Sequence, residues 1–255
     1  MKATLAGLGA KESLAGGGEG RAIASFPKAV YVSLPAGIVV LVSPSVHPGP
    51  LHLLLDGAPP ELPPGTRVEV ATRRLRVGGI DIDLRDAAEW AGALPSPAQL
   101  ASGATLLMEV ASDLASRSAL HADPFRDRAA DARNRLRAGD LAGMVECLAG
   151  LGPGLTPAGD DALAGALFVL RVLGGDEAER ALVDAACMAR TSVIASAFLP
   201  WAARGQALAP GHDLLKSAAY EDRHGCLTAC QALARIGGTS GAEFALGLTW
   251  ALAAR

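Results

Sequence analysis

The chain has 255 residues; half are hydrophobic, 19% are charged, and the formal net charge is −3. This length and composition are typical of a globular protein and exclude a disordered or fibrous chain. The charge balance argues against a general nucleic-acid binder, which carries a strongly basic face. The cluster of Arg73, Arg74 and Arg76 alternates with other residues, so we expect it on a solvated strand.

Residues 21–85 are rich in Val, Ile, Pro and Gly, and their pattern predicts short strands. Gly-Pro, Pro-Pro and Gly-Gly breaks separate the apolar or alternating runs, which lie at 29–34, 37–43, 50–57, 67–77 and 80–84. Regularly spaced short strands predict an antiparallel β barrel or sandwich-like unit, which we assign to residues 1–95. We expect Gly16–Gly20 to be a flexible lead-in or a tight turn.

The pattern becomes helical from Ser96 onward. Ser96-Pro97 and Asp123-Pro124 each offer an N-cap followed by proline at the first helical position. Helices are predicted at 97–117, 124–138, 140–149, 157–173, 177–190, 192–204, 212–220, 223–236 and 240–254. The sequence therefore predicts an α+β protein in which an α-helical bundle over residues 96–255 follows the β unit.

Cysteine usage and hydropathy favour a cytoplasmic protein that does not enter a membrane. The four cysteines lie in helical segments without a second ligand pair, so we expect buried, reduced thiols. Residues 1–20 lack a signal-peptide core. The most apolar predicted helix, 162–173, is too short to span a bilayer and contains Arg171.

The most distinctive segment is GLGPGLTPAGDDALAGAL, which begins at Gly150. Its glycines allow a ligand to approach the main chain. Thr156 is suited to cap the next helix and Pro157 to be its first residue. Free N–H groups at such a helix start can hold a phosphate or a carboxylate. We therefore expect substrate contacts from Gly152, Gly154, Leu155 and Thr156.

Asp160 and Asp161 follow this loop and are the candidate catalytic residues. Adjacent helical residues project about 100° apart, so one carboxylate could face the loop while the other only stabilises the helix start. Beside an anion, a carboxylate must hold Mg²⁺ or orient a donor group, because otherwise it repels the ligand. Mg²⁺ is therefore a possible cofactor.

The loop does not match common nucleotide-binding motifs. No lysine follows its last glycine, as a phosphate-binding P-loop would require, and the segment before it reads as a helix, not a strand. The alternative interpretation is a glycine turn that only connects two packed helices.

Two further helix starts resemble the first. Thr191 and Ser192 precede one predicted helix, and Thr239, Ser240 and Gly241 lie at another. Each is an ordinary capping sequence when taken alone. The sharper hypothesis is that all three helix starts converge on one anion, so these five residues are also candidate substrate contacts.

The run GLGPGLTPAGDDALAG resembles the signature of a bacterial family of long-unassigned function. That family includes the AllH-type subunit of the oxamate carbamoyltransferase of allantoin breakdown. The segments ASFPKAVYV, GPLHLLL, TSVIASAFLPWAARG and GGTSGAEFALGL also resemble its recurrent segments, in the expected order. Two positions depart from the family pattern: Gly238 stands where members often have histidine, and Tyr31 where they often have asparagine.

The resemblance implies a subunit of a carbamoyltransferase-like enzyme that acts with partner subunits. Its substrate would be a small anion, either carbamoyl phosphate-like or a carboxylate, bound at residues 150–161. Two alternatives stay open: a ligand-binding or assembly subunit without its own chemistry, and a Mg²⁺-dependent phosphate-handling hydrolase or kinase that uses the aspartate pair. No serine or cysteine nucleophile set is recognisable, because the five histidines are dispersed.

Overall fold

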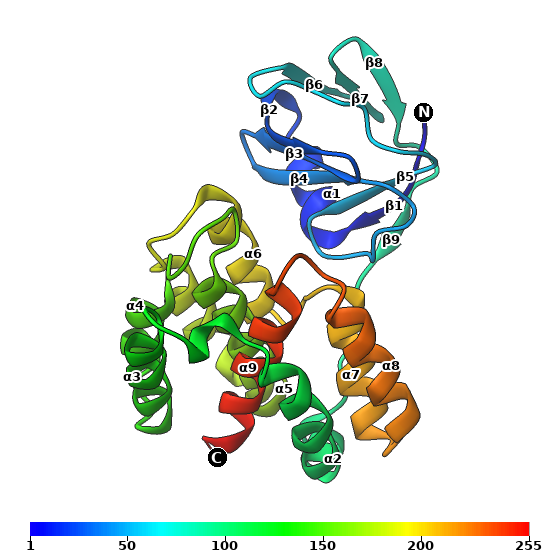
Figure 1. Ribbon diagram of the computed structural model, residues 1–255. Helices are drawn as coiled ribbons and strands as arrows, with labels where there is room; N and C mark the ends of the chain where they lie inside the picture. The colour runs from blue at the N-terminus through cyan, green and yellow to red at the C-terminus, as the bar shows by residue number, and fades with distance from the viewer. Residues whose placement is uncertain (255) are drawn as a thin grey trace. The chain divides into compact units, whose positions relative to one another are not determined.

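The structure is a computed structural model that describes residues 1–254. The chain forms two compact units, Met1–Ala91 and Gly92–Arg255. The first unit is a sheet with one helix and the second is helical (Figure 1). The predicted α+β class, with a β unit followed by a helical bundle, is confirmed.

The β unit is built on one sheet with the strand order β8-β7-β6-β2-β3-β4-β5-β1-β9. Its strands are β1 (Ala3–Gly7), β2 (Gly18–Phe26), β3 (Ala29–Leu34), β4 (Gly37–Val42), β5 (His52–Leu55), β6 (Arg67–Ala71), β7 (Arg74–Val77), β8 (Ile80–Asp83) and β9 (Ala88–Trp90). The sheet is mixed, because β4 pairs with β5 and β1 pairs with β9 in parallel. The expectation of a purely antiparallel unit is therefore wrong at these two pairs.

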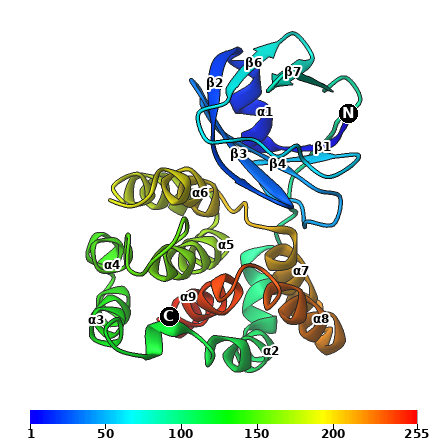
Figure 2. The same ribbon diagram turned by 45° about the horizontal axis from the view of Figure 1, so that its top comes forward.

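The sheet curls so that its edge strand β8 comes back to the residue just before β1. Asp83, at the end of β8, forms a parallel bridge with Lys2 and donates its backbone N–H to the Met1 carbonyl at 3.1 Å. The helix α1 (Leu8–Ala15) lies inside this curl (Figure 2). Alternate residues of the strands, including Val30, Val32 and Leu41, are fully buried there, as period-two alternation predicts.

The helical unit contains α2 (Pro97–Ala115), the short η1 (Ala119–His121), α3 (Arg126–Arg137), α4 (Leu141–Leu148), α5 (Ala158–Cys187), α6 (Val193–Ala203), α7 (Ala209–Ala219), α8 (Arg223–Leu233) and α9 (Ser240–Ala253). The predicted start of α2 is confirmed: Ser96 and Gln99 form a reciprocal capping box ahead of Pro97. The predicted cap at Asp123 is wrong, because α3 begins at Arg126, after Pro124.

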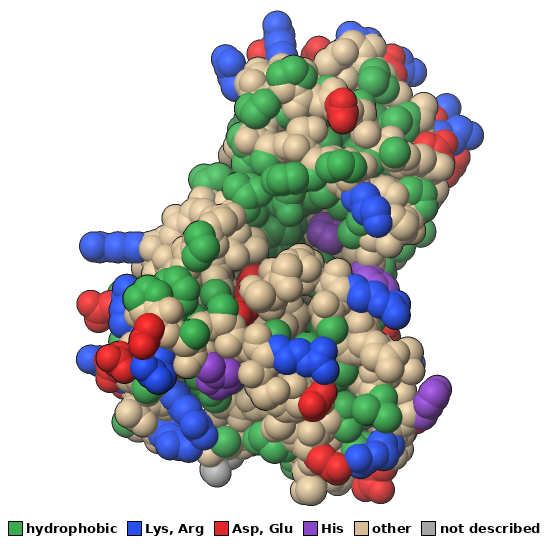
Figure 3. Space-filling model, viewed as in Figure 1, with side chains coloured by type: hydrophobic (Ala, Val, Ile, Leu, Met, Phe, Trp, Pro, Cys, Tyr) green, Lys and Arg blue, Asp and Glu red, His purple; other side chains and the backbone are tan. Residues whose placement is uncertain are grey.

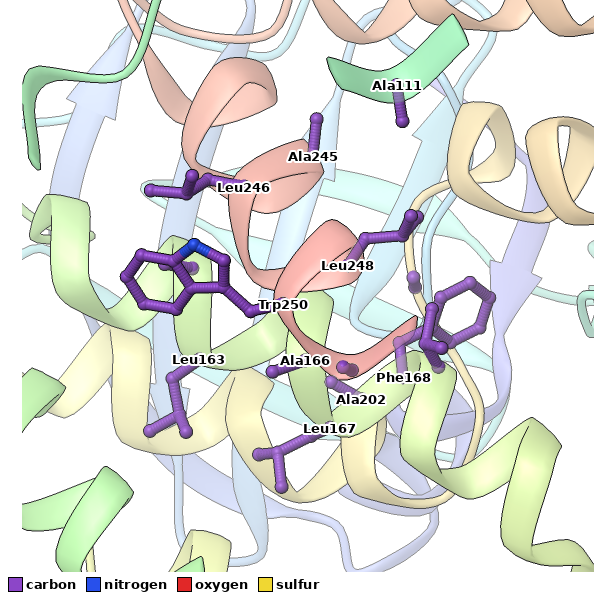
Figure 4. Close-up of a cluster of buried hydrophobic side chains, with 14 of the residues drawn as sticks. Ala111, Leu163, Ala166, Leu167, Phe168, Ala202, Ala245, Leu246, Leu248 and Trp250 are labelled. Atoms are coloured by element: carbon purple, nitrogen blue, oxygen red, sulfur yellow. The ribbon is translucent and has the colours of Figure 1, made fainter. Parts of the chain in front are cut away.

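The core of the helical unit lies where α5 and α9 cross. Figure 4 shows Phe168 of α5 beside Leu248 of α9, Ala111 of α2 near Ala245 of α9, and Trp250 on the opposite side of α9 from Leu248. All five side chains are buried. The two helices that are apolar nearly all round are therefore the central ones, as their composition predicts.

The range of α5 contains two helical segments that meet at a kink at Gly175, where φ is 63° and ψ is −161°. The predicted break between helices ending at 173 and starting at 177 coincides with this kink. Arg171, which is buried, reaches across it to Asp176 at 2.6 Å and to Glu179 at 2.9 Å. These ion pairs link the two halves of α5 across the kink.

Positive and negative side chains are interspersed over the face of the helical unit that Figure 3 shows. No helix within residues 1–254 combines the length and apolar character that a bilayer crossing requires. The four cysteines are free thiols. Burial is confirmed for Cys226 and Cys230, whereas Cys187 is exposed at the end of α5.

Candidate functional site

The glycine-rich segment connects the end of α4 to the start of α5. Gly150, Gly152 and Gly154 have φ values of 70°, 111° and 103°, which L side chains rarely adopt. A Cβ at Gly152 would lie 3.1 Å from the Ala158 nitrogen, whereas a Cβ at Gly154 would meet nothing within 4 Å. The backbone conformation therefore requires these glycines, and the space beside Gly154 is open.

Helix α5 begins one residue later than predicted. Its N-cap is Pro157, with extended angles of −52° and 149°, and no side chain caps the first turn. The prediction that Thr156 caps this helix is wrong. The Thr156 hydroxyl instead forms a hydrogen bond with the Asp161 carboxyl. Asp160 and Asp161 both lie in the first turn, as predicted.

Asp160 ties the glycine loop to the segment before α6. Its side chain is 2% exposed. It accepts a hydrogen bond from the Gly150 N–H at 3.1 Å and another from the Thr191 hydroxyl. Burial raises the pKa of Asp160, and these two hydrogen bonds oppose that rise. Both contacts lie within the protein, and they hold the glycine loop against the segment before α6.

Asp161 is half-buried and faces the start of α9. Burial raises the pKa of its carboxyl to about 8, and the nearby carboxylates of Asp160 and Glu243 add to the rise. Hydrogen bonds with the Ser240 and Thr156 hydroxyls act in the opposite direction. At neutral pH Asp161 is therefore mostly a neutral carboxylic acid, which can donate one hydrogen bond.

The close approach of α5 and α9 brings Asp161 and Ser240 together. A Cβ at Gly165 would lie 2.0 Å from the Phe244 carbonyl oxygen, and a Cβ at Gly247 would lie 1.7 Å from that of Ala162. Only glycine fits at these two positions, so the helix backbones are in direct contact. The first turns of α5 and α9 are consequently neighbours.

Ser192 fulfils its predicted role as the cap of α6. Its hydroxyl oxygen accepts a hydrogen bond from the Ala195 N–H at 3.0 Å and donates to the Leu155 carbonyl. The Thr191 hydroxyl donates to Asp160. Both hydroxyls are thus engaged within the protein, and they hold the glycine loop against the start of α6.

The three candidate residues at the start of α9 differ. Ser240 is half-buried and forms a hydrogen bond with Asp161. Thr239 is exposed, and its side chain makes no capping hydrogen bond. Gly241 is buried against α8, and a Cβ there would lie 1.9 Å from the Leu233 carbonyl oxygen. The helix starts of α5, α6 and α9 therefore converge, but mainly through Asp160, Asp161, Thr191 and Ser240.

Glu243 belongs to this cluster although the sequence did not single it out. It is fully buried and accepts hydrogen bonds from the Ser118 hydroxyl and, at 2.8 Å, from the Ala119 N–H. Glu243 lies three residues after Ser240, which is the spacing of a capping box. This spacing is the sequence signal that could have identified Glu243. The structure uses this carboxylate to hold the segment between α2 and α3.

The arrangement offers hydroxyls, backbone N–H groups and carboxyls. Throughout residues 1–254, no group of three or more His, Cys, Asp or Glu side chains is arranged to hold a metal ion. His212 is buried beside Phe168, and burial lowers its pKa to about 4, so it is a neutral member of the core. The available chemistry is hydrogen bonding to a small polar or anionic ligand.

Residues 148–252 match the family described as oxamate carbamoyltransferase subunit AllH. The matched range runs from the last residue of α4 into α9 and contains every candidate site residue. No curated protein and no solved structure matches the chain. The match supports the AllH-type resemblance for this part of the helical unit.

Replacing Ser192 by alanine should lower the free energy of unfolding by about 1 kcal/mol, because an N-cap hydroxyl is lost. The loop should also loosen, since Leu155 loses its tie to α6. Urea unfolding measures the first effect, and the rate of thermolysin cleavage near Leu155 measures the second. Ser196→Ala is the matched control, because its hydroxyl only bonds the Val193 carbonyl one turn back. Equal cleavage rates in the two variants would contradict the tie.

Proposed function

We propose that this chain is a subunit of an oxamate carbamoyltransferase-like enzyme and that residues 150–161 bind its anionic substrate. The family match supports the class of enzyme. The observation that carries the site is Asp161, which bonds to Thr156 at the end of the glycine-rich segment and whose raised pKa keeps it mostly neutral. A neutral acid beside an anion avoids the repulsion that a carboxylate would cause.

In the proposed reaction, the amide nitrogen of oxamate attacks the carbonyl carbon of carbamoyl phosphate. A C–N bond forms, the C–O bond to phosphate breaks, inorganic phosphate leaves, and the amide nitrogen gives up one proton to a base, for which the departing phosphate suffices. Such a transfer depends on positioning and on hydrogen bonds to developing charge.

Two kinds of group in this chain suit those tasks. The backbone around Gly152, Gly154 and Leu155, together with the N–H of Ala158 at the start of α5, would hold the anion. The next three N–H groups of α5 already donate to the carbonyls of Leu151 and Pro157. Asp161 would donate a hydrogen bond to a substrate oxygen, with Thr156 and Ser240 orienting it. Thr191 and Ser192 would shape the loop without touching substrate, since their hydroxyls are engaged.

Partner subunits would complete the site. The polar partners of Asp160 and Asp161 are hydroxyls, a backbone N–H and other carboxylates. A phosphate that carries two charges is normally bound by arginine or lysine as well. We therefore assign that cationic contribution to another subunit, in agreement with the family description as one subunit of an enzyme.

The test is reconstitution of activity from carbamoyl phosphate and oxamate, followed by phosphate release and by detection of the carbamoylated product. The chain alone should be inactive, and the chain with its partner subunits should be active. In the assembly, Asp161→Ala should lower the rate about a hundredfold, the usual cost of removing one transition-state donor. Asp161→Asn should recover part of the rate, because its amide also donates.

The matched control is Asp184→Ala, an exposed position on α5. Full activity of the assembly with Asp161→Ala would refute the donor role and favour an assembly subunit without chemistry. Phosphate release from ATP by the chain alone, abolished by EDTA, would instead support the Mg²⁺-dependent hydrolase or kinase. Gly238→His restores the common family residue at a position where a Cβ meets nothing within 4 Å, so the variant should fold and retain activity.

A further inference from the structure

The β unit contains a pocket of about 660 Å³ that none of the functions above uses. It lies between α1, the strands β1, β5 and β6, and the segment after β8. Its lining residues are Ala6, Lys11, Leu14, Ala15, Gly17, Leu53, Val70, Ala71, Thr72, Arg73, Leu84 and Ala87. All of them belong to the first compact unit.

The floor of the pocket is apolar. Ala6, Leu53 and Val70 are members of the buried core of the curled sheet, and Leu14 and Leu84 pack against that core. Four alanines and one glycine are among the lining residues, so small side chains leave the space unfilled. The volume falls within the range of pockets that bind small organic molecules.

Two of the lining residues, Lys11 and Arg73, are cations, and no lining residue is acidic. Arg73 sits in the turn between β6 and β7 with a φ of 59°. Its carbonyl accepts the Leu84 N–H at 3.0 Å, which fixes the turn against the segment after β8. The neighbouring Arg74 and Arg76 pair with Asp81 at 3.5 and 2.9 Å. Across residues 1–254 Arg73 forms no ion pair, so its charge is available to a ligand.

Lys11 is the second cation, and Glu89 would compete with a ligand for its ammonium group. Its Nζ lies 2.5 Å from Glu89 Oε2 of β9, and both side chains are about half exposed. An exposed pair of this kind is weak, so an anion in the pocket can compete for the ammonium group.

We propose that this pocket binds an amphipathic organic anion, a carboxylate with an apolar body. The acid group would lie at Lys11 and Arg73, and the apolar body would lie against Ala6, Leu53 and Val70. The pairing of a cationic edge with an apolar floor excludes a purely inorganic anion as the best ligand, because such an ion would leave the apolar surface in contact with water.

Titration calorimetry of the full chain with octanoate tests the proposal. Octanoate should bind at one site, whereas acetate, which lacks the apolar body, and 1-octanol, which lacks the charge, should each bind at least about tenfold more weakly, a difference of about 1.4 kcal/mol. Absence of octanoate binding, or equal binding of octanoate and acetate, would overturn the proposal.

Variants then locate the site. Arg73→Asn removes the charge while keeping a residue that tolerates positive φ, and it should weaken octanoate binding about fivefold. Ala87→Leu should narrow the pocket and weaken octanoate binding. Glu89→Gln should tighten binding about threefold, because Lys11 loses its competitor.

The control variant is Arg76→Ala, which removes a cation of the same hairpin that pairs with Asp81 and does not line the pocket. It should bind octanoate as the unmodified chain does. A melting temperature measured for each variant confirms folding. Binding that is unchanged by Ala87→Leu in a folded protein, or that falls equally in Arg73→Asn and Arg76→Ala, would place octanoate elsewhere and overturn the assignment.

Discussion

Replacing Asp161 by asparagine should raise the free energy of unfolding at pH 8 by about 5 kcal/mol. The reason is the pKa of about 8 that burial imposes on this carboxyl in the folded chain. In the unfolded chain the same group has a pKa of about 3.9. Above pH 4 the unfolded chain therefore loses a proton that the folded chain still holds.

The direction of the effect follows from that difference in protons. Because the folded chain binds more protons at Asp161 than the unfolded chain, the free energy of unfolding falls as the pH rises from about 4 to about 8. Below pH 4 the contribution of Asp161 is complete, and above pH 8 it is lost. Asparagine does not titrate, so the variant should match the unmodified chain at pH 4 and exceed it progressively toward pH 8.

Urea unfolding at pH 4, 6 and 8 gives this difference, since titrating groups that do not interact with Asp161 contribute equally in the two proteins. Asp184→Asn, on the exposed side of α5, should give a difference close to zero at all three pH values. If Asp161→Asn instead destabilises the chain equally at every pH, the carboxyl is ionised in the folded state and the role of a neutral donor fails.

Gly247→Ala should lower the free energy of unfolding by about 3 kcal/mol, at the upper end of the cost of overpacking a core. The new Cβ would lie 1.7 Å from the Ala162 carbonyl oxygen, which is backbone and cannot move without displacing α5. The gain in helix propensity from glycine to alanine, about 1 kcal/mol, is too small to compensate. Separation of the two helices should also weaken the contact between Asp161 and Ser240.

Gly238→Ala provides the comparison, because a Cβ at that position meets nothing within 4 Å. Its unfolding free energy should change by less than about 0.5 kcal/mol. The pH dependence of Gly247→Ala adds a second measurement: once α9 moves away, Asp161 gains water and the stability difference between pH 4 and pH 8 should shrink. Equal stability of the two variants would show that α5 and α9 are not in backbone contact.

Local signals in the sequence predicted much of the helical unit. The α2 start was predicted from Ser96-Pro97 alone, because an N-cap residue followed by proline is a signal between neighbouring residues. The kink at Gly175 also follows from glycine itself. The prediction that Thr156 caps α5 was wrong, because a local signal does not show which partner a side chain finds in the folded chain. Pro157 has the extended N-cap conformation, and the Thr156 hydroxyl bonds to Asp161.

Non-local features could not be derived in the same way. The strand β9 has three residues, too few for a periodic pattern, and α1 is too short for its pattern to separate it from a loop. The pKa of Asp161 depends on α9, which lies about 80 residues away in the sequence. The sequence identified the aspartate pair. Only the crossing of α5 and α9 shows that Asp160 is a buried hydrogen-bond acceptor and that Asp161 is a neutral acid.

The position of β1 has a consequence for the order in which the sheet can assemble. This strand, Ala3–Gly7, is synthesised early, yet its neighbours are β5 at His52–Leu55 and β9 at Ala88–Trp90. Its pairing therefore closes long loops, and such contacts form slowly. Strands β2, β3 and β4 can pair as local hairpins while β1 is still unpaired. A ribosome-bound chain that stops before residue 90 should hold β1 with one free edge, a state open to association with other chains.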